Sequence, residues 1–496
     1  MICYFISLVI AFFTRRTFLD ILGADFIGYT ATTQSLLGFL NLAELGISTA
    51  IAYILYKPLF NDDKDKINEI ISVFGYLYRI IGYIILTLGV LISFFIPLIF
   101  PDISFSYTVC YIGYYAYLFS SLLGYFVNYK QTLLSADQRN YEITGYYQIV
   151  ISAKTLLQMI FVIYFKSMIL YLILEILFGA IYSIILSRRV NIIYPWLTAE
   201  VKLGHKIFKK YPEIVKYIKQ LFAHKLGSYV QFQMIPILIY SYVSLPVVAM
   251  YNNYTMISQR LSFLVSSVMD STSAGIGNLV SERNDEKIYD VYCQLFSARV
   301  LISSLFTLNF YYLINPFIEI WVGQEYILEN IIVFIVSGLL FLQMCRGTTD
   351  QFINAYGLFS DVWAPLVEVL IFLTLAISLG GFLGLTGVLL GPLVSIIVIV
   401  YFWKPYFLYS RGFSRPFKQY LKLFLVNIIP LGVTYCVSEN LSPHLTFHIA
   451  SYSWVNWVIN ALVYLFVSTI QLIIYGYILS PDLRKFIKRL ITHYAR

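Results

Sequence analysis

Long apolar runs recur along the whole chain and are separated by short polar connections. Each run is about 20 residues long, the length that an α-helix needs to cross the roughly 30 Å hydrocarbon core of a bilayer. Because backbone groups in lipid must hydrogen-bond within their own segment, the runs predict about 14 transmembrane helices. We expect these helices near residues 2–22, 28–54, 76–98, 107–129, 144–165, 168–187, 226–245, 247–270, 293–314, 329–349, 362–380, 384–403, 420–438 and 454–478.

Composition excludes a set of soluble domains. Of 496 residues, 59% are hydrophobic and 12% are charged, about half the roughly 25% of charged residues that soluble domains carry. The predicted fold class is therefore an all-α polytopic membrane protein. The five cysteines are scattered through apolar runs without metal-ligand spacing, so we expect neither a disulfide framework nor a metal site. No nucleotide-binding or hydrolase motif is present, and we expect a protein that is not an enzyme and has no cofactor.

Basic residues concentrate in every second connection and in the C-terminal tail. This asymmetry predicts that both termini are cytoplasmic. The longest polar stretch, residues 188–225, is one of these basic connections. It is either an amphipathic helix on an anionic leaflet or an ordinary linker. The net charge of +8 therefore requires no nucleic acid partner.

The chain also echoes itself at an offset near 220 residues. Residues 61–67 after the second run resemble residues 284–288 after the eighth, and residues 136–138 resemble 355–357. Arg79 and Arg299 match in the same register. The repeat predicts two six-helix bundles with the same orientation, which is a transporter design with the substrate site between the bundles. The predicted organisation is a bundle at 1–187, a linker at 188–225, a bundle at 226–403, and two extra helices with a basic tail at 404–496.

Polar residues form a stripe on one helix of each predicted bundle. At 100° per residue, the polar positions of the second run fall within an arc of about 80°, and the eighth run has a similar stripe. Lipid does not solvate such stripes, so they line either a wet cavity or helix–helix contacts. The candidate cavity residues are Gln34, Asn41, Asn252 and Gln259.

Cations outnumber acids within the apolar runs. An embedded charge costs at least about 2.5–3.5 kcal/mol and needs a partner or a function. A guanidinium matches phosphate oxygens bidentately, so an anion is the natural missing partner. The candidate anion-binding residues are Arg15, Arg16, Arg260, Arg79 and Arg299. Arg79 and Arg299 could instead reach the cytoplasmic headgroups.

Acids within the apolar runs are fewer. Glu44, Glu175 and Glu368 could pair with embedded cations, among them Lys154. Glu44 lies within the stripe of the second run. It could take up a proton or cation and couple transport to an ion gradient, or it could have a structural role.

The opening of the chain resembles a known family. Residues 15–28 (RRTFLDILGADFIG), 42–47 (LAELGI) and 55–59 (LYKPL) are similar to the Wzx-type flippases of the bacterial polysaccharide-transporter family. That family belongs to the multidrug/oligosaccharidyl-lipid/polysaccharide (MOP) exporter superfamily. The fourteen-helix plan and the six-helix repeat extend the resemblance over nearly the whole chain.

The resemblance implies a function. Such proteins move undecaprenyl-pyrophosphate-linked oligosaccharides across the bacterial inner membrane, for O-antigen, capsule or exopolysaccharide assembly. It implies a cationic central cavity to which Arg15 or Arg16, Glu44 and Arg260 contribute, with Gln34, Asn41 and Asn252 as sugar contacts. Membrane lipids, a polysaccharide polymerase and other assembly proteins are the implied partners.

Four alternatives remain open. One is a non-catalytic assembly scaffold, which would leave the embedded arginines unexplained. A multidrug exporter of the same superfamily would need an acid-dominated cavity for cationic drugs. A lipid II flippase would handle the same pyrophosphate chemistry. A membrane glycan polymerase or ligase would need a larger outer loop with catalytic groups than the connections here provide.

Overall fold

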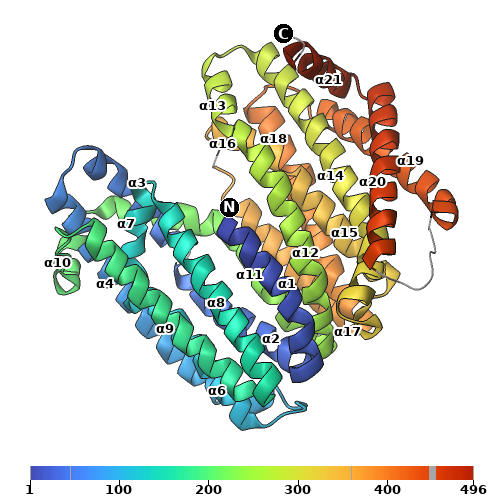
Figure 1. Ribbon diagram of the computed structural model, residues 1–496. Helices are drawn as coiled ribbons and strands as arrows, with labels where there is room; N and C mark the ends of the chain where they lie inside the picture. The colour runs from blue at the N-terminus through green and yellow to red at the C-terminus, as the bar shows by residue number, and fades with distance from the viewer. Residues whose placement is uncertain (1, 45, 359, 446–453, 495–496) are drawn as a thin grey trace. The chain divides into compact units, whose positions relative to one another are not determined.

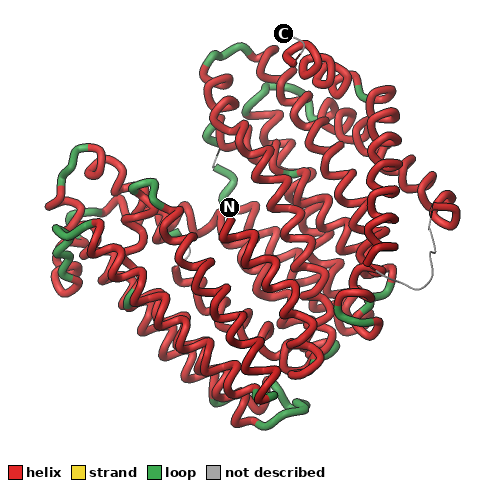
Figure 2. Tube along the Cα trace, viewed as in Figure 1, coloured by secondary structure: helices red, strands yellow, loops and turns green. Residues whose placement is uncertain are grey.

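The computed structural model describes residues 2–44, 46–358, 360–445 and 454–494, and this part of the chain consists of helices and connections without a strand (Figures 1 and 2). The predicted all-α class is therefore confirmed. The chain forms two compact units, Met1–Ala249 and Met250–Arg496. Each is described by itself below.

Unit 1 contains the first eleven α-helices and the start of α12. They are α1 (Ile2–Leu22), α2 (Ala24–Leu40), α3 (Ile47–Phe60), α4 (Lys64–Ser93), α5 (Ile96–Ile99), α6 (Tyr107–Phe126), α7 (Gln131–Ala136), α8 (Asn140–Phe165), α9 (Met168–Ile193), α10 (Gly204–Phe208) and α11 (Pro212–Tyr242). Short 3₁₀ turns lie at η1 (Asn41–Glu44), η2 (Asn128–Lys130) and η3 (Val201–Leu203). Helices α6, α8 and α9 pack side by side, and α1 packs on α8 (Figure 1).

Unit 2 is built around the long helix α14, against which α15, α19, α20 and α21 pack (Figure 1). Its helices are α12 (Leu245–Met269), α13 (Ser273–Ser281), α14 (Asp285–Trp321), α15 (Asn330–Cys345), α16 (Gly347–Ala355), α17 (Trp363–Ile396), α18 (Lys404–Arg411), α19 (Lys418–Leu445), α20 (Trp454–Leu479) and α21 (Pro481–Tyr494). Turns η4 (Asp270–Thr272) and η5 (Gln324–Tyr326) and the π-helical segment η6 (Ile397–Trp403) connect some of them.

Eight helical segments in the described part of the chain are long and apolar enough to cross a membrane. One of them, Trp363–Arg411, covers the two predicted runs at 362–380 and 384–403. These runs meet at Gly384, whose φ of 56° and ψ of −130° interrupt the helix. All fourteen predicted runs fall mainly on helices of the structure. The chain is therefore a multi-pass membrane protein.

The sequence pattern predicts one continuous second helix, but the structure divides it. The run at 28–54 divides into α2, the 3₁₀ turn η1 and α3. Helix α3 begins after Gly46, which has a left-handed φ of 89° that a residue with a Cβ rarely adopts. The apolar run continues through this break, which is why the hydrophobic pattern alone does not reveal it.

The sequence repeat has a structural counterpart. In unit 1 the order is α2, η1, α3 and α4, and in unit 2 it is α12, η4, α13 and α14. The matched polar segments cap the matched helices: Asp63 accepts a hydrogen bond from the Lys66 amide at 3.0 Å, and Asn284 accepts one from the Lys287 amide at 3.1 Å. Both are N-cap interactions that satisfy a free amide of a helix start.

The turns of the repeat match as well. Asp62 and Arg283, which precede the two caps, have φ values of 49° and 55°. Gln138 and Gly357, the last residues of the second pair of matched segments, have φ values of 59° and 66°. Left-handed residues are uncommon outside glycine, so two matched pairs indicate that the same supersecondary unit occurs in both halves.

The basic connection between α9 and α11 folds back onto unit 1. The amides of Thr198 and Glu200 donate to Asn68 Oδ1 at 2.8 Å and to Ser72 Oγ at 2.9 Å, both on α4. Helix α9 extends to Ile193 and α11 begins at Pro212, so helices enter the predicted linker 188–225 from both ends. The boundaries predicted for the bundles and the linker stay a prediction.

Helix α21 is amphipathic and packs on α14 in unit 2. Leu483 is buried against its neighbours, and Lys485 Nζ lies 2.7 Å from Asp290 Oδ1. The hydrogen bond to Asp290 raises the pKa of the Lys485 ammonium, while burial raises the pKa of the neighbouring Asp482 carboxyl. Lys485 therefore remains charged at neutral pH and ties the end of the described chain to α14.

Candidate functional site

Glu44 lies in the break of the second helix and is held by three hydroxyl groups. The Tyr78 hydroxyl of α4 donates to Oε1, as does Ser48 Oγ at 2.9 Å. Tyr125 of α6 approaches Oε2 at 3.5 Å. Three convergent donors satisfy a carboxylate without a cation. Glu44 thus connects the break to the helices α4 and α6, and Tyr78 and Tyr125 are site residues that the sequence pattern did not single out.

The two polar candidates nearby lie in different environments. Gln34 is exposed on α2, and Asn41 in η1 accepts a hydrogen bond from Ser121 Oγ of α6 at 3.2 Å. The predicted stripe is therefore interrupted where α2 ends. Gln34 stays before the break, whereas Asn41 and Glu44 lie within it and contact α6.

The two N-terminal arginines also differ. Arg15 is half-buried, and its Nη2 donates to the carbonyl of Ala249 at 3.2 Å. Arg16 is exposed and lies 3.6 Å from Asp20 on the same helix, with exposed fractions of 60% and 52%. An exposed pair contributes little to stability, so the Arg16 guanidinium can exchange this partner for another anion at small cost.

Helix α12 carries the candidates of the second stripe. Asn252 and Arg260 are half-buried within unit 2, whereas Gln259 is exposed. Asn252 and Arg260 are separated by eight residues, so at 100° per residue their side chains are about 80° apart around α12. Arg260 therefore lies beside the polar stripe that contains Asn252.

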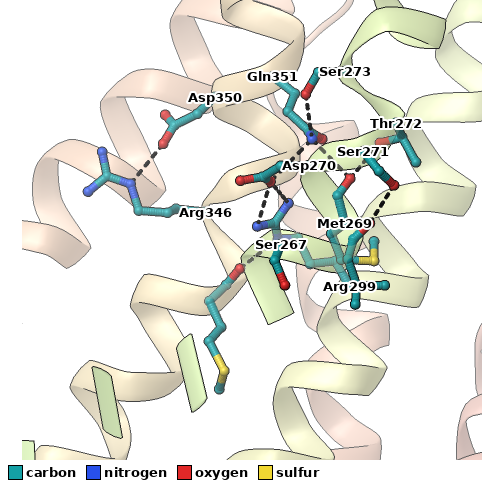
Figure 3. A network of polar contacts seen from close by, with 12 residues as sticks. Ser267, Met269, Asp270, Ser271, Thr272, Ser273, Arg299, Arg346, Asp350 and Gln351 are labelled. Atoms are coloured by element: carbon teal, nitrogen blue, oxygen red, sulfur yellow. Dashed lines mark hydrogen bonds and ion pairs between the residues drawn. The ribbon is translucent and has the colours of Figure 1, made fainter. Parts of the chain in front are cut away.

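Arg299 is fully buried within unit 2, with 1% of its surface exposed, and Figure 3 shows its contact with Asp270. Its Nε donates to the Met344 carbonyl at 2.7 Å, and both Nη atoms lie 3.3 Å from Asp270 Oδ1. Gln351 Nε2 donates to the same carboxylate at 3.3 Å and to Ser273 Oγ at 3.0 Å. The network joins α14 to η4, α13, α15 and α16. The guanidinium of Arg299 is therefore committed to helix packing, and Asp270 is the partner that the sequence analysis missed.

A positional signal for Asp270 does exist. It lies in the turn η4 that ends α12, as Glu44 lies in the turn η1 that follows α2. Both carboxylates receive donors from the next long helix, Tyr78 on α4 and Arg299 on α14. An acid directly after the second helix of each repeat is thus the pattern that identifies both residues.

Arg79 does not share the environment of its sequence match. It is exposed on α4, whereas Arg299 is buried in α14. Arg79 lies near the middle of α4 (Lys64–Ser93), where its long side chain is exposed. The structure thus separates two residues that the sequence register had placed together.

A further group of charges lies where α16 meets η6 and α18. Asp350 accepts from Arg346 Nε at 2.8 Å, as Figure 3 shows, and from Lys404 Nζ at 3.1 Å. Buried Glu368 also interacts electrostatically with Arg346, so the group contains two cations and two carboxylates. The Arg346 cation is therefore paired, in contrast to the sequence expectation that acids among the spans were too few.

The described residues contain no group of three or more His, Cys, Asp or Glu side chains that could hold a metal ion. Among the described side chains, Cys110, Cys293, Cys345 and Cys436 are free thiols. The chemistry that these units offer is the binding of charged and polar groups by arginine, amide and hydroxyl side chains.

Comparison with protein-family models and with curated proteins gives no match. The structure is similar to that of the lipid II flippase MurJ in an inward-closed conformation, with a TM-score of 0.64 and 17% sequence identity over 95% of this chain and 97% of the other. It is also similar to an inward-facing multidrug resistance transporter of the MATE family, with a TM-score of 0.53 and 14% identity over 83% and 95%. That transporter is a member of the MOP superfamily. The chain therefore shares the fold of these two proteins.

Proposed function

We propose that this protein is a flippase that translocates undecaprenyl-pyrophosphate-linked oligosaccharide across the bacterial inner membrane. It would act by alternating access of a cationic cavity and would serve O-antigen, capsule or exopolysaccharide assembly. It would work with both termini in the cytoplasm. No covalent bond changes in such a reaction, so the protein is a transporter and not an enzyme.

The observation that carries the proposal is the half-buried arginines on apolar helices. Arg15 on α1 and Arg260 on α12 are half-buried guanidinium groups within largely apolar helical sequence. Moving a bare pyrophosphate through hydrocarbon has a cost of tens of kcal/mol in idealised estimates. A guanidinium offers two parallel donors to phosphate oxygens and replaces part of the lost hydration.

The other candidates would have separate roles. Exposed Arg16 and Arg79 can meet the anion or the anionic headgroups during entry. Gln34, Asn41, Asn252 and Gln259 would contact sugar hydroxyls. Arg299 acts indirectly in this scheme, because its guanidinium already binds Asp270. Glu44 would hold the break in the second helix or take up a coupling proton or cation.

Two alternatives are equally compatible with the fold. The similarity to MurJ favours a lipid II flippase, and the similarity to a MATE transporter favours a multidrug exporter. The opening motif at residues 15–28 and 42–47 favours the oligosaccharide branch, and the excess of arginine opposes a site for cationic drugs.

Mass spectrometry of lipid-linked oligosaccharides from cells lacking the gene separates these functions. Accumulation of undecaprenyl-pyrophosphate oligosaccharide on the cytoplasmic side, with loss of surface polysaccharide, supports the proposal. Accumulation of lipid II identifies the lipid II flippase instead. Unchanged lipid-linked intermediates with intact surface glycan, in a strain with no second flippase, contradict both and favour the drug exporter.

A further inference from the structure

Unit 1 contains a pocket. Its lining includes none of the residues proposed above as anion or sugar contacts. It has a volume of about 520 Å³ and lies among α6, α8 and α9, with α7 and η2 at one end. Small-molecule sites usually measure about 300–1,000 Å³. The pocket is therefore large enough for a compact organic ligand and is independent of any site elsewhere in the chain.

The charges of the pocket cancel. Lys154 of α8 and Glu175 of α9 are the two charged residues among its lining residues. Lys154 Nζ lies 2.8 Å and 2.7 Å from the two carboxylate oxygens, and the side chains are 15% and 17% exposed. A pocket with zero net charge favours neither an anion nor a cation. A neutral ligand avoids the desolvation of a further charge.

The same pair still offers hydrogen bonds. An ammonium has three donors and a carboxylate about four acceptor sites, which is more than their mutual contacts use. Thr144 and Gln131, which also line the pocket, add a hydroxyl and an amide. A ligand that both donates and accepts at several points would match this set.

Asn128 adds a polar group that protein atoms leave incomplete. Its Nδ2 donates to Ser183 Oγ at 3.0 Å, and the Ser183 hydroxyl donates to the Gly179 carbonyl at 3.0 Å. Because the Ser183 proton is already used, the Asn128 amide must present its nitrogen to Ser183. This leaves Oδ1 of the 8% exposed Asn128 without a hydrogen-bond partner at the pocket wall. An unpaired buried carbonyl calls for a donor.

The remaining wall is aromatic and apolar. Tyr147 and Tyr182 meet edge to face with ring centroids 5.5 Å apart, and Phe178 and Val150 pack beside them. Aromatic rings combined with a few convergent polar groups suit a ligand with an apolar face and a polar rim. A pyranose ring has this form, since its C–H groups lie on its faces and its hydroxyl groups around its edge.

We propose that this pocket binds one ring of a neutral saccharide, from either a free sugar or a lipid-linked one. The inference concerns binding alone and does not require translocation. A failure of the proposed transport function would leave it standing, and the reverse also holds.

The test uses the full chain in phosphatidylcholine nanodiscs and follows thermal unfolding. The probes are methyl β-glucopyranoside as a free sugar, octyl β-glucopyranoside as a membrane-borne one, and an octyl oligo(ethylene glycol) as an amphiphile without sugar. The double variant Lys154→Gln/Glu175→Gln removes both charges together, and Thr144→Val alters an exposed hydroxyl with little risk to folding. Asn427→Leu, a buried asparagine of α19 in unit 2, is the matched control for Asn128→Leu.

A saturable rise in the unfolding temperature with a glucoside, but not with the ethylene glycol amphiphile, is expected. Loss of one neutral hydrogen bond should weaken binding about three- to tenfold in Thr144→Val and Asn128→Leu, and Asn427→Leu should bind normally. Stabilisation by both glucosides identifies a free-sugar site, and by octyl glucoside alone a lipid-linked one. No stabilisation by either glucoside, or equal affinity in the wild type and all pocket variants, overturns the proposal.

Discussion

The buried guanidinium of Arg299 needs a carboxylate partner and a neighbouring residue without a Cβ. Its side chain is 1% exposed, and its guanidinium pairs with the carboxylate of Asp270, which is half-exposed (Figure 3). Removing one partner of such a pair leaves a buried charge with reduced compensation, which is more harmful than removing both partners. Gly347 belongs to the same arrangement, because a Cβ there would overlap the Arg299 guanidinium.

We predict that Asp270→Ala destabilises the protein by about 1–3 kcal/mol, as expected for lost hydrogen bonds to a charged group. Denaturation of the purified full chain in detergent measures this. The double variant Asp270→Ala/Arg299→Met should recover part of the loss. The control is Glu282→Ala, which breaks the exposed pair with Lys287 and should cost about 0–1 kcal/mol. Equal effects of Asp270→Ala and Glu282→Ala would show that the buried pair is not special.

Gly28 gives a second prediction at the scale of one residue. It is buried on α2, and a Cβ there would overlap the carbonyl of Leu245. We expect Gly28→Ala to destabilise the protein by about 1–3 kcal/mol through overpacking. Gly145→Ala on α8 meets no atom within 4 Å and should be neutral or stabilising by about 0.5–1 kcal/mol, because alanine favours the helix. Unfolding measurements that rank the two variants in the opposite order would refute the close approach of Gly28 to the Leu245 carbonyl.

At the scale of elements, the hydrophobic pattern predicts where the helices lie, but it does not predict where a helix is interrupted. The runs place the helices because burial in lipid requires long apolar segments. The break between α2 and α3 is invisible to this signal, since Leu42 and Ala43 keep the run apolar. It depends on the left-handed Gly46 and on the hydrogen bonds of Glu44, which are tertiary features.

For the candidate site, too, the sequence predicts some features and not others. The sequence identifies Glu44, Arg15 and Arg260 by their polarity within apolar runs. It cannot identify Tyr78 and Tyr125 as the donors to Glu44, because tyrosine is abundant, with 44 in the chain. Pairings such as Arg299 with Asp270 depend on helix packing and not on spacing in the sequence.

The break also yields a test of the role of Glu44. If Glu44 acts as a hydrogen-bond acceptor for Tyr78 and Ser48, Glu44→Gln keeps the geometry and should retain most of the export activity. Glu44→Leu leaves these hydroxyl groups without an acceptor and should lower stability by about 1–3 kcal/mol. Surface polysaccharide and thermal unfolding are measured in parallel. Normal unfolding with abolished export in Glu44→Gln would instead assign the carboxyl to ion coupling.

At the scale of the molecule, the charge asymmetry makes a prediction about orientation. The matched turns at Asp62 and Arg283 should both lie in the cytoplasm, and the turn at Lys166 on the opposite side. Single cysteines introduced at these positions, in a chain freed of its own cysteines, can be labelled in intact and in opened cells. We expect an impermeant maleimide to reach position 166 in intact cells and positions 62 and 283 only after opening. Labelling of positions 62 and 166 from the same side would contradict the proposed topology.

We propose that transport of an anionic substrate depends most on Arg260. This residue is half-buried on α12, whereas the guanidinium of Arg299 contacts Asp270 with both of its Nη atoms. A lysine in its place keeps the charge but presents a point donor in place of a planar fork, so it cannot bind phosphate oxygens bidentately. We therefore predict that Arg260→Ala abolishes export of lipid-linked oligosaccharide at normal protein levels, and that Arg260→Lys restores only a small part. Surface polysaccharide and accumulated intermediates report the outcome, with Arg79→Ala as the exposed control that should reduce export far less. Wild-type surface polysaccharide in Arg260→Ala would remove this arginine from the transport path and leave Arg15 and Arg16 as the anion contacts.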